Sequence, residues 1–174
     1  MKSKGIEFRE DVKPSDAQAI RDITESTGFF SEHEIDVAVE LLDERLAKGT
    51  RSGYFFLFAG KAGRPIGYAC FGPIACTLAS YDLYWIAVHS DFRGQGIGSI
   101  LLAESERIIR NMGGERIYIE TSSREQYGPT RGFYLHCAYE EDAILEDFYG
   151  PGDSKVIYRK VLEGSGDARK NSKT

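Results

Sequence analysis

The first half of the chain changes between strand-like and helix-like patterns of apolar residues. Residues 6–9, in which apolar and charged side chains alternate, predict a short first strand. Apolar positions then recur at helical spacing in 14–26 and again in 31–49, so the sequence predicts two consecutive helices. Ser31, followed three residues later by Glu34, is the signature of a capping box and indicates where the second helix begins.

Aromatic and β-branched residues dominate the middle of the chain and predict three strands. The runs 54–59 and 66–70 are separated by a turn that contains glycine and proline, which is typical of a hairpin. We expect the second of these strands to extend to Leu78, with a bend at 72–73, where glycine precedes proline. The run 81–88 is mostly apolar, as expected of a central strand that is buried in a sheet.

The remaining elements alternate between helix and strand before a final hairpin. Apolar positions at helical spacing predict a helix over 99–112, and the run 116–121 follows as a strand. A short helix is expected over 129–137. Two further strands, 139–148 and 155–161, form a hairpin around a turn with glycine and proline. The predicted element order is therefore β-α-α-β-β-β-α-β-α-β-β.

Length and composition fit a single domain over 1–162. The chain has 174 residues, of which 41% are hydrophobic and 28% charged, and these values are ordinary for a globular protein. No apolar run approaches the roughly 18 residues that a membrane span needs, so we expect no membrane partner. Residues 163–174 are polar, and we expect them to form a disordered tail.

Net charge and the positions of cysteine and histidine argue against several classes of function. A formal net charge of −5 argues against a nucleic-acid-binding surface as the main role. The three cysteines form no C-x-x-C pair, which is typical of a reduced cytoplasmic protein rather than a disulfide scaffold. The three histidines have neither metal-ligand nor catalytic-triad spacing, so we expect no metal cofactor.

The most informative segment is a glycine-rich turn at 93–98 (Arg-Gly-Gln-Gly-Ile-Gly), between strand 81–88 and helix 99–112. At a helix N-terminus several backbone N–H groups lack intrahelical partners and the helix dipole adds partial positive charge, so such turns bind anions. The dinucleotide fingerprint requires G-x-G-x-x-G, and the nucleotide P-loop requires a lysine after its glycines. This turn has neither, so it predicts a phosphate-bearing ligand of another kind.

Two motifs together resemble the GNAT superfamily of acetyl-CoA-dependent N-acetyltransferases. The R-x-x-G-x-G motif at 93–98 is similar to the pyrophosphate-binding signature of that family, and F-Y-x-x-x-A-Y at 133–139 resembles its tyrosine-bearing helix. The resemblance covers about residues 5–162. It implies an α/β (α+β) fold whose mixed sheet of about seven strands is splayed between the fourth and fifth and flanked by about four helices. It also implies acetyl-CoA as cosubstrate in the splayed gap, without a metal.

The resemblance implies which residues hold acetyl-CoA. The pyrophosphate would lie on backbone N–H groups of the turn and of the first helical residues, with an arginine as the cation beside them. The pantetheine arm would pair with the backbone of the strand before the turn, in the manner of an added strand. The residues assigned in this way are Ile86, Val88, Arg93, Gln95, Gly96, Ile97, Gly98 and Ser99.

Three side chains are candidates for proton transfer at the reacting centre. Tyr134 matches the family tyrosine, whose phenol would protonate the departing thiolate. The amine must also lose a proton, and a carboxylate on the central strand is a common base in the family. Asp82 is such a residue and shares its strand parity with Ile86, whereas Glu120 ends the next strand. The sequence leaves Asp82, Glu120 and a water relay open as the base.

The chain departs from the family pattern at two positions before Tyr134. Relatives often have asparagine seven residues and alanine four residues before that tyrosine, where this chain has Tyr127 and Thr130. Cofactor contacts of that asparagine therefore do not apply here. The resemblance implies an N-acetyltransferase that moves the acetyl group directly to a primary amine. The alternative is a non-catalytic acyl-CoA-binding or interaction module with the same fold.

The resemblance implies an acceptor site between the first two helices and the last hairpin, and both are acidic here. Six acidic side chains lie in 31–48 and five in 140–147. They would concentrate a cationic amine, of a small molecule or a protein, although such charges are also typical of solvated surfaces. Family habit leaves a homodimer through the final hairpin open. Aromatic candidates for the pocket walls, and equally for the core, are Phe29, Phe30, Tyr127 and Tyr149.

Overall fold

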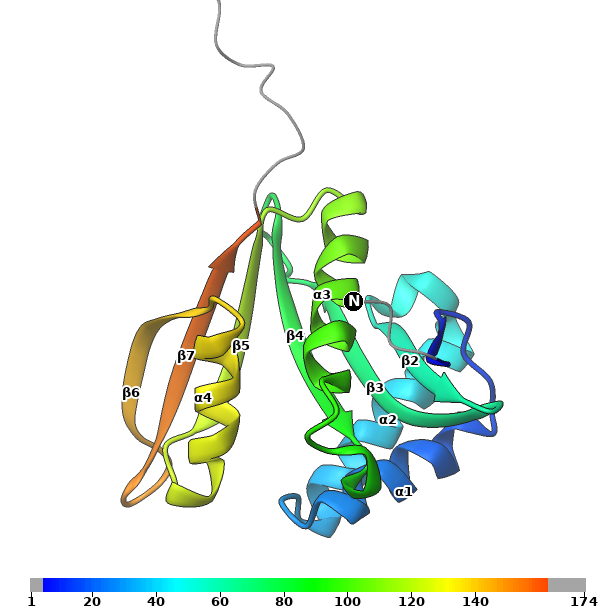
Figure 1. The fold of residues 1–174 in the computed structure, drawn as a ribbon. Helices are drawn as coiled ribbons and strands as arrows, with labels where there is room; N and C mark the ends of the chain where they lie inside the picture. The colour runs from blue at the N-terminus through cyan, green and yellow to red at the C-terminus, as the bar shows by residue number, and fades with distance from the viewer. Residues whose placement is uncertain (1–4, 163–174) are drawn as a thin grey trace, which may run out of the picture.

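The computed structural model describes residues 5–162, so the predicted disorder of 163–174 lies outside the described residues. A seven-stranded mixed sheet has the strand order β1-β2-β3-β4-β5-β7-β6 (Figure 1). The strands are β1 (Glu7–Arg9), β2 (Phe55–Lys61), β3 (Arg64–Pro73), β4 (Ser80–Val88), β5 (Arg116–Ser122), β6 (Glu140–Gly150) and β7 (Asp153–Val161). The helices are α1 (Asp16–Thr27), α2 (Glu32–Lys48), α3 (Ile97–Asn111) and α4 (Gly128–His136). The predicted element order and fold class are confirmed.

Helices cover both faces of the sheet and divide the core into two clusters. Along β2, Phe56 and Phe58 point into the cluster beneath α1 and α2, whereas Leu57 and Ala59 point into the cluster beneath α3. Because side chains alternate between the two faces of a strand, a strand that is buried on both sides has a continuous apolar sequence. The central strands are therefore held from both faces, which makes them a rigid support for the groups at their ends.

Carboxylates set the starts of both N-terminal helices. The predicted capping box is confirmed, because Ser31 Oγ accepts from the Glu34 N–H at 3.3 Å and the Glu34 carboxylate accepts from the Ser31 N–H at 2.7 Å. Helix α1 begins at Asp16, two residues after the predicted start at Pro14. The buried Asp16 carboxylate pairs with Arg9 at 2.7 Å, which ties the start of α1 to β1.

The predicted extension of the third strand to Leu78 is wrong. β3 ends at Pro73, and the N–H of Ile74 donates to the carbonyl of Ser80 at 2.9 Å, which closes the turn into β4. Proline has no N–H for a sheet ladder, so a strand that reaches one ends there readily. Leu78 lies in the turn and is fully exposed.

At Gly72 the backbone of β3 approaches the segment before β2 so closely that no side chain fits. A Cβ atom there would overlap the carbonyl oxygen of Gly53. We therefore expect Gly72→Ala to lower the free energy of unfolding by about 1–3 kcal/mol, the usual cost of overpacking. Chemical denaturation measures the change.

Gly132→Ala is the matched control, because Gly132 lies in α4 with open space around its Cβ position. Alanine has the higher helix propensity, so this variant should be as stable as the parent or more stable. Equal losses in the two variants would contradict the close approach as the cause.

Candidate active site

The two central strands, β4 and β5, pair over a short stretch and then separate like the arms of a V (Figure 1). Ser80–Asp82 pair with Arg116–Tyr118, and within residues 5–162 the rest of β4 has no strand partner on this side. β5 stays paired with β7 from Arg116 to Ser122. The predicted splay between the fourth and fifth strands is confirmed.

The exposed edge of β4 presents backbone N–H groups to the gap. On the opposite edge, the N–H of His89, the residue after β4, donates to the carbonyl of Ile66 in β3 at 2.8 Å. Successive peptide groups of a strand alternate in direction, so the N–H groups of Ile86 and Val88 point away from β3 and into the gap. Both residues line the cavity in this gap.

A bulge at Tyr84 changes which face of β4 the catalytic candidate Asp82 occupies. Cys70 pairs with Trp85 and the next residue of β3, Phe71, pairs with Leu83, so Tyr84 is one residue in excess. An extra residue reverses the alternation of side chains beyond it.

The predicted shared parity of Asp82 with Ile86 is therefore wrong. Ile86 and Val88 pack against the cluster beneath α3, whereas Leu83, which neighbours Asp82, already belongs to that cluster. Asp82 consequently points to the face covered by α1 and α2. Asp82 and the other catalytic candidate Tyr134, which belongs to the cluster beneath α3, thus approach the gap from opposite faces of the sheet.

The glycine turn at 93–98 adopts left-handed backbone conformations and leaves its backbone uncovered. Gly94 and Gly96 have φ of 72° and 75°, and no atom lies within 4 Å of either Cβ position. Gly96 is the N-cap of α3, which therefore begins at Ile97 rather than at the predicted Ser99. Left-handed conformations favour glycine, and the missing side chains leave the backbone open to a ligand.

The structure places the predicted phosphate-binding residues in two groups. Of the predicted residues, Arg93 and Gly98 line the cavity, and so does Gly94 of the same turn, which was not among them. Arg93 also donates to the carbonyl of Thr27 at 3.0 Å, and its guanidinium lies 5.0 Å from the ring centre of Phe29. The remaining predicted phosphate-binding residues lie in the glycine turn and the first turn of α3 but do not line the cavity: Gln95, Gly96, Ile97 and Ser99.

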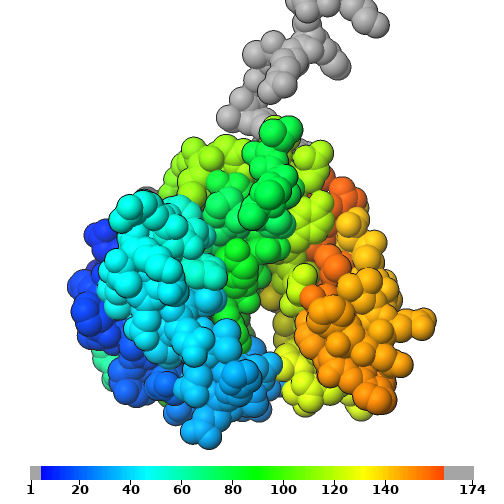
Figure 2. Space-filling model, turned by 180° about the vertical axis from the view of Figure 1, so that it is seen from behind, coloured from blue at the N-terminus to red at the C-terminus, as the bar shows by residue number. Residues whose placement is uncertain are grey.

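The gap opens into a cavity of about 1290 Å³ that gathers most of the predicted site residues. Figure 2 shows it as a hollow between the helices α1 and α2 and the β6–β7 hairpin. Strands β4 and β5 supply its floor, and the α1–α2 loop and α4 supply its sides. The catalytic candidates that line it are Asp82, Glu120 and Tyr134.

The two candidate carboxylates have different surroundings. Glu120 is half exposed and pairs with Lys155 at 2.6 Å. Burial, and then the negative charge of Glu120, raise the pKa of Asp82 to about 6, while Lys155 lowers it. Within the described residues Asp82 has no ion-pair partner of its own. Asp82 therefore has the pKa of a base that accepts a proton near neutral pH.

Tyr134 is buried at the other side of the cavity, in a cluster of aromatic rings. Its ring centre lies 5.4 Å from Phe133, 6.0 Å from Tyr139 and 5.9 Å from Tyr158. Burial and the nearby thiol of Cys137 raise the pKa of Tyr134 above its usual value. The phenol therefore keeps its proton at neutral pH, which is the state that an acid needs.

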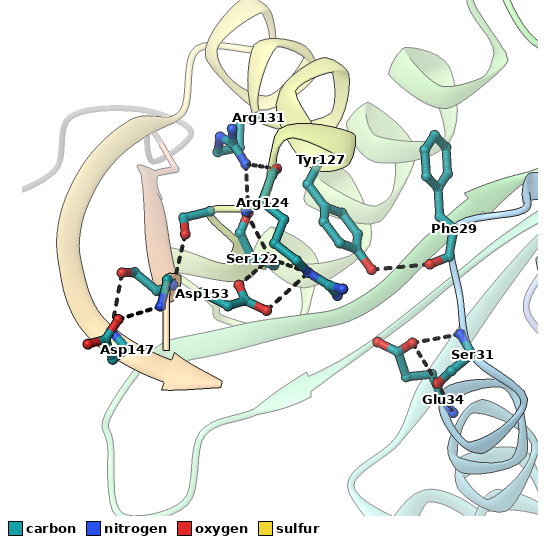
Figure 3. A network of polar contacts seen from close by, with 12 residues as sticks. Phe29, Ser31, Glu34, Ser122, Arg124, Tyr127, Arg131, Asp147 and Asp153 are labelled. Atoms are coloured by element: carbon teal, nitrogen blue, oxygen red, sulfur yellow. Dashed lines mark hydrogen bonds and ion pairs between the residues drawn. The ribbon is translucent and has the colours of Figure 1, made fainter. Parts of the chain in front are cut away.

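A polar network that the sequence did not predict joins β5, β7 and α4 (Figure 3). Ser122 Oγ donates to the Asp153 carboxylate, which also pairs with Arg124 Nε at 3.0 Å. Arg131 Nη1 donates to the carbonyl oxygens of Ser122 and Arg124 at 2.7 and 2.9 Å. These bonds hold the first turn of α4 against the end of β5, and so fix the helix that contains Tyr134.

A second contact crosses the open end of the V. The hydroxyl of Tyr127 donates to the carbonyl oxygen of Phe29 at 3.3 Å, and the two rings lie 6.2 Å apart (Figure 3). Tyr127 precedes α4, and Phe29 lies in the loop between α1 and α2. We call this contact the Phe29–Tyr127 bridge, because it joins the two halves of the molecule beside the cavity.

The predicted aromatic walls line the cavity, whereas most of the predicted acidic residues do not. Of the acidic residues in 31–48 only Glu34 reaches its lining, and none in 140–147 does. Phe29, Phe30, Tyr127 and Tyr149 all line it. No pattern in the sequence indicated the other lining residues that matter here, because distant elements bring them together: Tyr54, Tyr84, Trp85, Tyr118, Arg124 and Asp153.

Comparison with known proteins decides the family. The sequence model of the Acetyltransferase (GNAT) family matches residues 17–139, more than half of the chain. This chain belongs to the GNAT acetyltransferase family. The resemblance that the two sequence motifs indicated is thus confirmed, and the protein is assigned to the acyltransferases.

Solved structures share the fold over nearly the whole chain. A GNAT-family protein from Desulfovibrio desulfuricans is 45% identical, with a TM-score of 0.89 over 90% of this chain and 99% of that one. An aminoglycoside 6′-N-acetyltransferase complexed with coenzyme A is 16% identical, with a TM-score of 0.73 over 92% and 99%. The ribosomal-protein-S18-alanine N-acetyltransferase from Escherichia coli is 16% identical, with a TM-score of 0.71 over 94% and 97%. The last two show the shared fold alone. A search of curated proteins found no match.

Between residues 5 and 162 no group of three or more histidine, cysteine, aspartate or glutamate side chains is arranged to hold a metal ion. None of the helices in this range is long and apolar enough to cross a membrane.

Lys155 holds down the pKa of Asp82, so removing its charge should raise that pKa above about 6. Lys155→Met also frees the Glu120 carboxylate, whose negative charge acts in the same direction. A pH titration of the Asp82 carboxyl carbon by NMR measures the change. Lys48→Met, an exposed lysine paired with Glu44, is the control and should leave the titration unchanged. An unchanged or lower Asp82 pKa in Lys155→Met would contradict the assignment.

Proposed function

We propose that this GNAT acetyltransferase moves the acetyl group of acetyl-CoA directly to a primary amine. The observation that supports this most is the splay of β4 from β5 next to an open glycine turn at the start of α3. β4, one arm of the V, would offer unpaired N–H groups to an extended ligand, and the glycine turn that follows β4 would offer an anion site. The structural neighbour that acetylates aminoglycosides is complexed with coenzyme A, which has both a pantetheine arm and a pyrophosphate.

The residues present fit such a cosubstrate. The pyrophosphate would lie on the N–H groups of Gln95, Gly96, Ile97, Gly98 and Ser99, with Arg93 as the cation beside them. The N–H groups of Ile86 and Val88 would pair with the pantetheine arm. The N–H of Val88 would also polarise the thioester carbonyl as negative charge develops on its oxygen.

The two titratable groups on opposite faces of the gap would divide the proton transfers. Asp82 takes a proton from the ammonium, and the free amine attacks the thioester carbonyl carbon. The tetrahedral intermediate then collapses with cleavage of the C–S bond, and Tyr134 donates its proton to the departing thiolate. The nitrogen loses its second proton through solvent to the Tyr134 phenolate, which restores the phenol, and Asp82 releases the first proton, so one proton in total is released to solvent.

The phosphate site can be tested with two variants of equal shape and strain. Gly94 lines the cavity at φ 72° with open space around it, and both Asn and Asp tolerate this conformation. Gly94→Asp places a negative charge beside the pyrophosphate, so we expect it to weaken acetyl-CoA binding tenfold or more relative to Gly94→Asn. Calorimetric titration with acetyl-CoA, with CoA and NAD as controls, measures this. Equal affinities of the two variants would place the pyrophosphate elsewhere.

Removing the acid should slow turnover without weakening cosubstrate binding. We expect Tyr134→Phe to reduce kcat about 10²-fold or more, the range of general acid catalysis, at an unchanged acetyl-CoA Kd. Tyr158→Phe is the matched control, because it removes one hydroxyl from the same aromatic cluster and does not line the cavity. Thiol release in an amine-acceptor assay measures both. Full turnover in Tyr134→Phe would remove this residue from the mechanism, and acetyl-CoA binding with no turnover of any amine in the parent would favour the non-catalytic module.

The assignment of Asp82 as the base predicts how kcat/KM changes on the acidic side of its pH profile. A base acts only when it is ionised, so kcat/KM should fall as the pH decreases through about 6, the raised pKa of Asp82. In Asp82→Asn this limb should disappear and kcat/KM should drop at every pH above it. A profile that keeps its limb near pH 6 in Asp82→Asn would show that another group, such as Glu120, is the base.

A further inference from the structure

The acceptor would bind in the part of the cavity between α1, α2 and the β6–β7 hairpin. This part has fewer unpaired charges than the acidic composition of these segments suggests. Glu120 is paired with Lys155 at 2.6 Å, and Asp153 with Arg124 at 3.0 Å. Glu34 is used in the capping box of α2, where the positive end of the helix dipole offsets part of its charge. Among the described residues this leaves Asp82 as the carboxylate of the cavity without a polar partner. One free carboxylate matches one ammonium rather than a row of them.

The wall beside Asp82 is aromatic. Trp85 packs edge-on against Phe30, with ring centres 4.9 Å apart, and Tyr84 packs in the same way against Tyr54 at 5.4 Å. All four residues line the cavity. Such faces bind the apolar body of a ligand and attract a nearby cation through the ring quadrupole, but they offer few partners to a ligand covered with hydroxyl or ammonium groups.

The Phe29–Tyr127 bridge limits the size of the acceptor. It connects the α1–α2 loop to the start of α4, and Arg93 ties the last residue of α1, just before this loop, to the glycine turn through the carbonyl of Thr27. These contacts connect the segments that border the hollow in Figure 2. The hollow is therefore enclosed by connected segments and is not an open groove. A small molecule enters such a hollow more readily than the surface of a folded protein does.

We propose that the acceptor is a small primary amine with a single positive charge and an aromatic body, of the 2-arylethylamine type. Its ammonium would lie at Asp82, and its ring would lie against Trp85, Tyr84 and the two rings packed on them. This substrate class rests on the acetyl transfer proposed above. It also narrows the acceptor expected from the sequence, because the charge pairing disfavours a polyamine and the bridge disfavours a protein lysine.

The chain has one tryptophan, and it is Trp85. Emission excited near 295 nm therefore comes from the proposed aromatic wall and reports binding without any turnover. With saturating CoA present, 2-phenylethylamine should change this emission saturably, with a Kd at least tenfold below those of n-butylamine and spermidine. n-Butylamine matches the charge without the ring, and spermidine supplies several charges. An equal or lower Kd for either of them would overturn the proposal, whether or not the enzyme turns over.

Turnover rates provide a second test of the proposed acceptor. We expect kcat/KM for 2-phenylethylamine to exceed that for n-butylamine, spermidine and a lysine-containing peptide by tenfold or more. Tyr84→Leu and, separately, Tyr54→Leu should each reduce the preference for 2-phenylethylamine over n-butylamine at least threefold. Phe8→Leu, which replaces an exposed aromatic residue of β1 outside the cavity, should leave this preference unchanged.

The outcomes separate the two proposals. A preference for spermidine or the peptide would overturn the arylethylamine class while acetyl transfer stands. No turnover of any amine would count against acetyl transfer, and the Trp85 emission titration would then decide the binding class by itself. An unchanged preference in both tyrosine variants would overturn the aromatic wall as its source.

Discussion

The separation of β4 from β5 is the constraint on which the rest of the site depends. Inside a sheet, backbone N–H and C=O groups must find partners, and leaving them unpaired away from water costs free energy. β4 leaves its partner after Asp82, so the N–H groups of Ile86 and Val88 face a gap that a ligand can fill. The fold tolerates the gap because each arm is supported separately: β4 by β3 and both helical layers, and β5 by β7. A ligand that binds as an added strand therefore completes a sheet that is already rigid on both sides.

The bulge at Tyr84 explains how one strand serves two tasks. Before it, Asp82 points to the face of α1 and α2, where an acceptor would approach. After it, Ile86 and Val88 pack toward the α3 face, where the strand leads into the glycine turn. Without the extra residue, the carboxylate and the two residues beyond it would point to the same side. Burial then gives Asp82 a pKa near 6, and Lys155 prevents that pKa from rising further.

Local patterns predicted most of the fold and the glycine turn, because helix periods, capping residues and turn glycines act over a few positions. The turn at 93–98 was visible for this reason, and so was the capping box at Ser31. The bulge was not, because one additional aromatic residue in an apolar run changes no pattern that periodicity can detect.

Contacts between distant segments were equally invisible in the sequence. The Phe29–Tyr127 bridge joins residues 98 positions apart, and Ser122 and Asp153 are 31 positions apart. The acidic residues also show what a sequence does not reveal. Composition correctly showed many carboxylates in 31–48 and 140–147, but which of them reach the cavity depends on helix rotation and strand register, which composition does not contain.

Hydrogen exchange at the edge of β4 is the most direct test of the central claim. The backbone N–H groups of Ile86 and Val88 face the gap, so saturating CoA should slow their exchange tenfold or more. The N–H of His89, already bonded to Ile66, serves as the internal reference and should change much less. Slowed exchange at Ile86 and Val88 would support a cosubstrate that binds as an added strand. Saturation with CoA and unchanged exchange at both residues would contradict it.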